Sequence, residues 1–387
     1  MRLRSERIVT PGGTVGGEVV VRDGRILDVM PRWRGRPRPA AGSGPVVELD
    51  RRWVVPGYID THVHGGGGAC ANADDPDEIT SMARFHAAHG TTALLATTIP
   101  APVDELEAAA RAIARSASRR EGAGVLGAHL EGPFLSPGRA GALDPEAFLE
   151  PDPAVLARLL TAGAGSIRVM TIAPELPGAP ELIDSLVSRG VVTSLGHTDA
   201  TYAQARAAVR RGARGATHLF NAMRPLHHRE PGVAGAVLDL PEVSCELICD
   251  GIHVDPAALR LALRAKGTKG VRLVTDAIHA AGMPDGSYRL AGAEVIVSAG
   301  RASVAGGGPI AGSTLTMDGA VRNAVRFLDL SLEEACIAAS SNPARLLGLG
   351  DRKGAISPGL DADLVVLDEE LRVCGTLIAG VWALGPP

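Results

Sequence analysis

The chain has 387 residues, of which 45% are hydrophobic and 21% charged, and its formal net charge is -4. This composition is typical of a globular protein with a large core, so neither nucleic acid nor a membrane is an expected partner. The five cysteines are scattered without a Cys-x-x-Cys pair and the charged start lacks a following apolar run, so we expect a reducing, cytoplasmic location.

Both ends of the chain alternate short β-type runs with turn residues. Near the start the runs are RIVTPGG, GEVVVRDGRILDVMP and VVELD, and near the end they are GAISPGLDADLVVLD and VCGTLIAGVWALG. Neither end has enough core to be stable alone. We therefore expect residues 1–50 and 355–387 to pair into one small β-sandwich domain.

Between the two ends, at residues 51–354, β-rich runs alternate with helix-length segments. Strands are expected at Val54–Asp60, Thr91–Thr98, Val125–Leu130, Ile167–Ile172, Val191–Leu195, Ala216–Leu219, Cys245–Cys249 and Arg272–Thr275. Helices are expected at Pro76–His89, Val103–Arg119, Pro153–Thr161, Pro180–Arg189, Tyr202–Arg211 and Pro256–Ala265. Alternating β and α units with eight strands favour an α/β fold of the (β/α)8 barrel type over an open doubly wound sheet.

The strongest local signal is the run DTHVHGGG, which begins at Asp60 and ends the first expected barrel strand. Because side chains alternate along an extended backbone, His62 and His64 point the same way and could hold one cation. Two histidines with one residue between them also occur by chance. The glycine run favours the metal interpretation, because it lets the backbone make room.

Other polar residues follow later strands of the expected barrel: Glu131 the third, His197 the fifth, His218 the sixth and Asp276 the eighth. The carboxyl ends of barrel strands meet at one rim, so these side chains are expected to lie together. Buried charges without a partner are costly. The constellation therefore predicts a divalent metal centre.

Several other residues are interpreted as structural. We expect His86 and His89 on the outer face of the first helix. We expect His129 beneath the metal, in support of it and not as a ligand. The segment Gly306–Pro309 lacks the spacing of a phosphate loop and is expected to let the chain pass close to substrate.

Taken together, eight motifs resemble the amidohydrolase superfamily and, within it, the N-acetylglucosamine-6-phosphate deacetylase family. They are PGYIDTHVHGGGG, HLEGPFLSP, SLGHTDATY, THLFNAM, HHREPG, CDGIHVDP, TDA and PGLDADLVVLD. The resemblance covers essentially the whole chain, and THLFNAM with HHREPG and DGIHVDP is its most specific part. The resemblance implies a metal held by Glu131, His197 and His218. A second ion is possible at His62 and His64, with Glu131 as a bridge.

The expected cofactor is thus one or two divalent ions, with zinc first and iron, manganese or cobalt accepted by the same donors. A divalent cation lowers the pKa of water from about 15.7 toward 7 and polarises an amide carbonyl. Asp276 would take the proton from the water and pass it to the leaving amine. The alternative for Asp276 is a carboxylate that caps the next turn.

The implied reaction is hydrolysis of the N-acetyl group of an amino-sugar 6-phosphate, with N-acetylglucosamine 6-phosphate first. N-acetylgalactosamine 6-phosphate or a specialised-pathway sugar is the alternative, and a non-catalytic sugar-phosphate-binding barrel is a further one. The resemblance assigns the phosphate to Arg229, commonly from a partner subunit, so a homodimer is expected. An exposed, solvated arginine is the alternative. The other assigned substrate contacts are Ala142, Asn221, Ala222, His253, Ile310, Ala311 and Gly312.

The chain departs from the family at one place. After EGPFLSP the family usually continues to Gly-Ala-His, whose imidazole binds the substrate carbonyl, whereas GRAGALDPE puts Leu143 there. Loss of one such donor can cost about 3 kcal/mol of transition-state stabilisation. Either a second ion supplies the polarisation or the substrate differs. The retained pair of His62 and His64 favours the first explanation.

Overall fold

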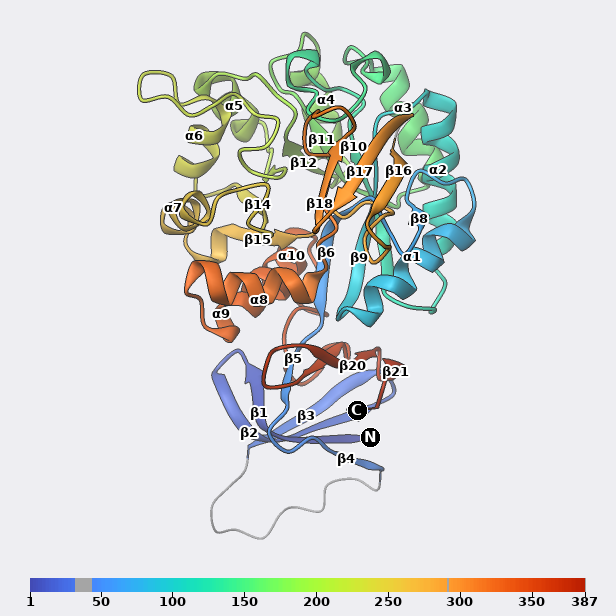
Figure 1. The fold of residues 1–387 in the computed structure, drawn as a ribbon, viewed down its shortest axis with the longest axis vertical. Coiled ribbons are helices and arrows are strands. Elements are labelled where there is room, and N and C mark those ends of the chain that lie inside the picture. The colour runs from blue at the N-terminus through green and yellow to red at the C-terminus, as the bar shows by residue number, and fades with distance from the viewer. Residues whose placement is uncertain (32–43, 291, 387) are drawn as a thin grey trace.

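The computed structural model describes residues 1–31, 44–290 and 292–386. Its two large sheets lie in different parts of the molecule, a barrel in the upper part of Figure 1 and a terminal sheet in the lower part. Among the described residues, no helix has both the length and the apolar character needed to cross a bilayer.

The barrel has eight parallel strands in the order β15-β14-β13-β12-β11-β10-β9-β6. They are β6 (Tyr58–Val63), β9 (Thr91–Thr98), β10 (Gly124–Glu131), β11 (Ile167–Ile172), β12 (Val192–Leu195), β13 (Gly215–Ala216), β14 (Ser244–Ile248) and β15 (Val271–Val274). The last residues of β6 pair with the segment just past β15: the N–H of Asp276 donates to the carbonyl of His62 at 2.9 Å, and Val63 and Ala277 form a parallel bridge. The predicted (β/α)8 barrel is confirmed.

Helices surround the barrel strands (Figure 1). They are α1 (Pro76–Ala88), α2 (Val103–Ser116), α3 (Pro153–Ala162), α4 (Ala179–Ser188), α5 (Tyr202–Arg210), α6 (Gly232–Asp239), α7 (Pro256–Lys266), α8 (Met317–Leu328), α9 (Leu332–Cys336) and α10 (Asn342–Leu346). Three begin with the same signal: Asp75, Asp152 and Asp255 each accept a backbone N–H two residues on and are followed by proline. A carboxylate at the N-cap and proline in the first turn both favour a helix start.

The terminal sheet joins strands from both ends of the chain. They are β1 (Arg2–Thr10), β2 (Gly13–Arg22), β3 (Arg25–Pro31), β4 (Val46–Glu48), β5 (Trp53–Pro56), β19 (Leu364–Leu367), β20 (Val373–Ile378) and β21 (Val381–Leu384). A separate apolar cluster, with Leu3 and Ile8 from the start and Leu364 and Leu377 from the end, forms its core. The sheet fits the expected small β-sandwich domain, and the domain boundaries after 50 and before 355 stay a prediction.

The first predicted strand, Val54–Asp60, is wrong as a single element, because the chain changes sheets within it. Pairing of β5 with β19 ends at Pro56, and β6 begins at Tyr58 in the barrel. Gly57 lies at the crossing, where its N–H donates to Asp363 and an added Cβ would lie 2.2 Å from the Oγ1 of Thr92. The close approach of the Thr92 side chain therefore favours glycine at this position.

A three-stranded antiparallel sheet that the sequence did not predict follows the barrel. It consists of β16 (Gly286–Leu290), β17 (Ala293–Ser298) and β18 (Arg301–Val304). Its apolar side chains share one buried cluster with Ile99 and Ile278, which follow β9 and β15. The small sheet thus packs at the carboxyl end of the barrel. A short hairpin, β7 (Gly65–Gly66) with β8 (Ala69–Cys70), follows β6 at the same end.

Candidate metal centre and active site

Six side chains at the carboxyl ends of barrel strands form two groups, in each of which possible ligand atoms lie within 4.8 Å of one another. The groups are His62, His64 and Asp276, and Glu131, His197 and His218. All six residues are buried, with at most 7% of their surface exposed. The structure therefore brings together every residue that the sequence predicts for the metal centre.

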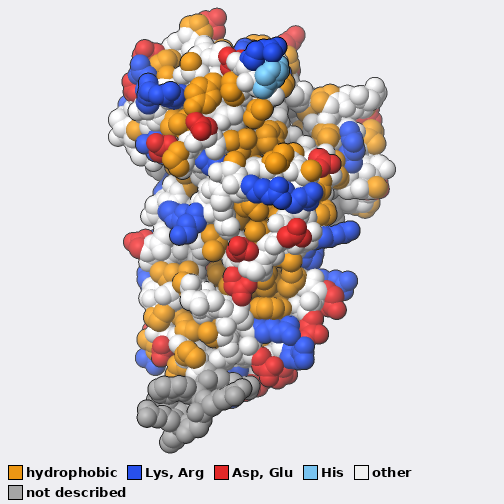
Figure 2. Space-filling view, turned by 90° about the vertical axis from the view of Figure 1, so that its left-hand side faces the viewer, with side chains coloured by type: hydrophobic (Ala, Val, Ile, Leu, Met, Phe, Trp, Pro, Cys, Tyr) orange, Lys and Arg blue, Asp and Glu red, His pale blue; other side chains and the backbone are white. Residues whose placement is uncertain are grey.

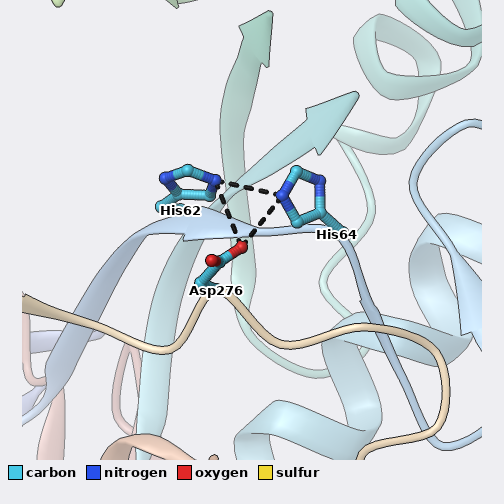
Figure 3. A group of neighbouring side chains, drawn as sticks. All are labelled: His62, His64 and Asp276. Carbon is cyan, nitrogen blue, oxygen red and sulfur yellow. Dashed lines mark hydrogen bonds and ion pairs between the residues drawn. The ribbon is translucent and has the colours of Figure 1, made fainter. Parts of the chain in front are cut away.

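The first group joins the end of β6 to the turn after β15 (Figure 3). The Nε2 atoms of His62 and His64 are 3.0 Å apart. The Oδ1 atom of Asp276 lies 3.1 Å from His64 Nε2 and 3.5 Å from His62 Nε2. Two imidazole nitrogens and one carboxylate oxygen thus face the same small space.

In the second group, Glu131 Oε1 lies 2.9 Å from His218 Nε2 and 3.2 Å from His197 Nε2, and the two Nε2 atoms are 3.1 Å apart. The other oxygen of the same carboxylate lies 3.4 Å from His64 Nε2. Glu131 therefore lies between the two groups, with one oxygen toward each.

The backbone turns these side chains toward the rim. His197, His218 and Asp276 have φ values of 46°, 30° and 51°, in the left-handed region that side-chain-bearing residues rarely adopt. Such strain is tolerated where surrounding structure enforces it, and it concentrates at functional sites. The glycine run lets two backbone segments approach closely at the same rim, since a Cβ on Gly65 would lie 2.5 Å from the backbone nitrogen of His279.

In three of the four imidazoles a hydrogen bond of Nδ1 orients Nε2 toward the site, whereas Nδ1 of His218 has no hydrogen-bond partner among the described residues. Nδ1 donates to a backbone carbonyl in His64 and in His197, at 2.9 Å each, and to a carboxylate in His62, also at 2.9 Å. The Nε2 atoms then face each other across a space that a proton or a metal ion can fill. Ligand atoms at 2.0–2.1 Å from a four-coordinate zinc lie roughly 3.3 Å apart, which is close to the observed spacings.

The electrostatics of the site favour positive charge. Burial acts to lower the pKa of His62, but the carboxylates of Glu246, Asp276 and Glu131 outweigh it and raise the pKa to about 10. Burial acts to raise the pKa of Glu131, yet His62 and His197 hold it well below its usual range. The carboxylates are thus ionised, and the donor set fits a divalent cation.

A cavity of about 270 Å³, a size close to that of small-molecule sites, is lined by five of the six residues, all but His62. The predicted substrate residues that line it are Ala142, Asn221, Ala222, His253, Ile310 and Gly312. Ala311 is buried in the apolar cluster under the small sheet and does not line the cavity. Leu143 lines it together with Ile99, Ile278 and Leu290, so part of the wall is apolar.

Arg229 lies outside the cavity lining of its own chain. It is exposed in the loop before α6, and its Nη1 lies 2.9 Å from the Nε2 of His228. Figure 2 shows basic and histidine side chains side by side near the upper end of the face drawn there, above a surface that mixes basic, acidic and hydrophobic side chains. The assignment of Arg229 to a partner's site stays a prediction.

The expectation that His86 lies on an outer helix face is wrong. His86 is buried, and its Nε2 donates to the carbonyl of Gly65 at 2.9 Å. Burial lowers its pKa to about 4, so the ring is neutral at pH 7. The ring can be buried here because residue 66 is glycine: a Cβ on Gly66 would lie 2.7 Å from the Nε2 of His86. His89 is half-buried and lies 3.4 Å from Asp318.

Glu246 is a contact of the site that the sequence analysis did not single out. It lies in β14, is fully buried, and receives the Nδ1–H of His62 at 2.9 Å. A signal was available: a lone charge stands in the apolar run SCELIC, and Arg272 stands at the paired position of the next strand. His129 lies beneath the site as expected, with its ring 4.8 Å from that of His62.

The sequence model of the amidohydrolase family matches residues 53–383. An N-acetylgalactosamine-6-phosphate deacetylase of Escherichia coli O157:H7 is 41% identical over 98% of both chains. An N-acetylglucosamine-6-phosphate deacetylase of Lysinibacillus sphaericus is 39% identical over 94% of this chain and 92% of its own. A solved structure of an alanine mutant of the Mycobacterium smegmatis N-acetyl-D-glucosamine-6-phosphate deacetylase, in complex with N-acetyl-D-glucosamine-6-phosphate, is 41% identical to this chain. The match covers 100% of this chain and 99% of the other at a TM-score of 0.93. The chain therefore belongs to the amidohydrolase family and, within it, to the branch of the N-acetylglucosamine-6-phosphate deacetylases.

Proposed function

We propose that this chain is a divalent-metal-dependent deacetylase that hydrolyses the N-acetyl amide of an amino-sugar 6-phosphate. N-acetylglucosamine 6-phosphate is the first substrate, and acetate and the free amine are the products. The observation that carries the proposal is the position of Glu131 between two groups of imidazoles on the floor of a small cavity. The relatives that carry such names, at 39–41% identity over nearly the whole chain, support the choice of substrate.

In the proposed site, Glu131, His197 and His218 would hold one ion. His62 and His64 would hold a second, to which Glu131 could also contribute an oxygen. Zinc is the first candidate because imidazole and carboxylate donors suit it, and iron, manganese and cobalt are the alternatives. When bound, such an ion polarises an amide carbonyl and lowers the pKa of water.

Asp276 moves the proton in the proposed reaction. Burial acts to raise its pKa, but His62 and His64 hold the pKa below its usual value, so the carboxylate is ionised and can accept a proton. It takes a proton from water as the water oxygen bonds to the carbonyl carbon. It gives that proton to the nitrogen as the C–N bond breaks.

The sugar is proposed to lie among Asn221, Ala222 and His253, with Ala142 and residues 310–312 completing its contacts. Asp250 accepts the Nδ1–H of His253 at 2.6 Å, which leaves Nε2 of that ring for the substrate.

Arg229 is proposed to bind the 6-phosphate in the site of a partner subunit, which requires a homodimer. A guanidinium suits this role because it binds phosphate oxygens bidentately. Replacing Arg229 with alanine should lower kcat/KM for the phosphorylated sugar by roughly 10–150-fold, mostly through KM, since a hydrogen bond to a charged group contributes about 1.5–3 kcal/mol. Steady-state kinetics on the sugar with and without phosphate measures this. Arg206→Ala, at an exposed position of α5, is the matched control. An equal loss on both sugars would remove the phosphate assignment.

Leu143 tests whether a second ion supplies the polarisation of the carbonyl. If it does, Leu143→His should change kcat only modestly, since the added donor repeats what the ion provides. If the site lacks that polarisation, the new imidazole should raise kcat by several hundredfold, about the worth of one oxyanion donor. Kinetics on the metal-loaded variant separates the two results.

The proposed function as a whole is tested by acetate release from metal-analysed protein. The panel consists of N-acylated hexosamines with and without the 6-phosphate. N-acetylgalactosamine 6-phosphate is the second candidate, because one relative at 41% identity carries that name. A chelator should abolish acetate release, and added zinc should restore it. Phosphate-independent rates would contradict the substrate class. Binding without chelator-sensitive acetate release would indicate a sugar-phosphate sensor instead. The expected cytoplasmic location stays a prediction.

A further inference from the structure

A fully buried ion pair lies directly beneath the site. Glu246 of β14 and Arg272 of β15 stand at paired positions on neighbouring strands, and both side chains are 0% exposed. Glu246 Oε1 and Arg272 Nη2 are 3.0 Å apart. Burying two charges costs about as much as their attraction returns, and apolar residues of similar volume often replace such a pair without loss of stability. The pair therefore calls for an explanation other than the stability of the barrel.

The second carboxylate oxygen of Glu246 provides that explanation. It accepts the Nδ1–H of His62 at 2.9 Å and the backbone N–H of His218 at 3.1 Å. One carboxylate therefore touches a residue from each of the two groups. The contact with His62 also fixes the ring, because Nδ1 bound to the carboxylate leaves Nε2 facing His64 and Asp276.

The rings of His64 and His197 are held in a different way from the ring of His62. Nδ1 of His64 and Nδ1 of His197 each face a backbone carbonyl at 2.9 Å, which the chain itself holds in place. The side chain of Glu246 must be held by something else. Arg272 does so with Nη2, while its Nη1 donates to the carbonyl of Ser244 at 2.9 Å.

His62, His129 and Glu246 also lie close enough together to hold an ion themselves. Atoms of these three side chains already make hydrogen bonds to protein groups. Nδ1 of His129 faces the carbonyl of Thr61 at 3.0 Å, and its Nε2 faces Thr171 Oγ1 at 2.7 Å. Since both ring nitrogens of His129 are engaged, this group supports the site above it and does not form a third one.

We propose that Glu246 is a positioning residue: it holds the ring of His62 so that Nε2 can bind the same ion as His64. Arg272 in turn holds the carboxylate of Glu246. The inference rests on the proposed function, because it takes the two groups as cation sites. The group around Glu131 has its own ligands. Glu246 contacts His218 only through its backbone N–H but contacts His62 through the ring, so loss of Glu246 should weaken mainly the ion held by His62 and His64.

The test compares metal binding in double variants that leave no unpaired buried charge. Glu246→Leu with Arg272→Met removes both charges and the hydrogen bond. Glu246→Gln with Arg272→Met keeps an amide oxygen that can accept it. Zinc content is measured by elemental analysis, zinc affinity by competition with a chelator, and folding by thermal unfolding. Glu18→Leu with Arg4→Met and Arg2→Met, which removes a buried carboxylate of the terminal sheet together with the two arginines that pair with it at 2.8 and 3.5 Å, is the control.

We expect the wild type and the control to bind two ions per chain. The leucine variant should keep the first ion and lose affinity for the second by about 10–100-fold. The glutamine variant should recover most of that affinity, which a role in packing alone would not give. Unchanged affinity in the leucine variant, or a single ion in the wild type, would overturn the proposal.

If the leucine variant does not fold, Glu246→Met with Arg272→Leu, which removes the same hydrogen bond and both charges with different packing, is measured against the same two outcomes. Zinc binding is measured without substrate. The role of Glu246 is thus judged separately from acetate release, and a protein that binds two ions but releases no acetate would contradict the proposed function alone.

Discussion

Replacing Asp276 with asparagine will lower kcat for N-acetylglucosamine 6-phosphate by roughly 10²–10⁴-fold, the range typical of a lost general acid–base group. Asparagine has nearly the same size and tolerates the left-handed backbone at this position, where φ is 51°, so the fold should be unchanged. The amide cannot accept the proton from water or return it to the leaving amine. Steady-state kinetics with measurement of zinc content tests this expectation.

Asp329→Asn is the matched control, because Asp329 also has a positive φ, of 54°, and lies at the end of α8, outside the cavity lining. Its kcat should equal that of the wild type. A nearly unchanged kcat in Asp276→Asn would show that another group moves the proton. It would favour the alternative that Asp276 only caps the turn after β15.

The second large effect is expected at Glu131, the carboxylate with one oxygen toward each group. Glu131→Gln keeps the shape and removes the charge, so both proposed ions should lose affinity. We expect acetate release to fall by about 10³-fold or more, because carbonyl polarisation and water activation both depend on the ion. Elemental analysis should find less than one zinc ion per chain.

The control for this change is Glu18→Gln, the same substitution at a buried carboxylate of the terminal sheet. Arg4 pairs with that carboxylate at 2.8 Å. It should lower the unfolding temperature and leave zinc content unchanged. Full zinc content with full activity in Glu131→Gln would contradict the assignment of this residue as a shared ligand.

The sequence predicted the barrel because its buried parallel strands appear as apolar runs, each followed by a helical pattern. It also predicted the six residues of the site, because alternation places His62 and His64 on one face and strand ends place the others on one rim. These inferences need only local geometry and the rule for barrels. The family resemblance added the contacts around the cavity, including the backbone around Ala311, whose side chain is buried in the apolar cluster.

Features that depend on contacts between distant segments could not be predicted in this way. The change of sheet at Gly57 depends on Thr92 and on Asp363. The burial of His86 depends on how closely α1 approaches the glycine run. The sequence of the small sheet β16–β18 alternates polar and apolar residues, which is typical of strands. Its position over the barrel, however, is set by packing against Ile99 and Ile278.

The central claim is that imidazoles and carboxylates from distant parts of the chain hold cations at one rim. Anomalous X-ray diffraction at the zinc edge, on crystals of the metal-loaded protein, tests it most directly. We predict one peak among Glu131, His197 and His218 and a second beside His62 and His64, on the other side of Glu131. A map with zinc elsewhere, or with none within bonding distance of Glu131, would contradict the account.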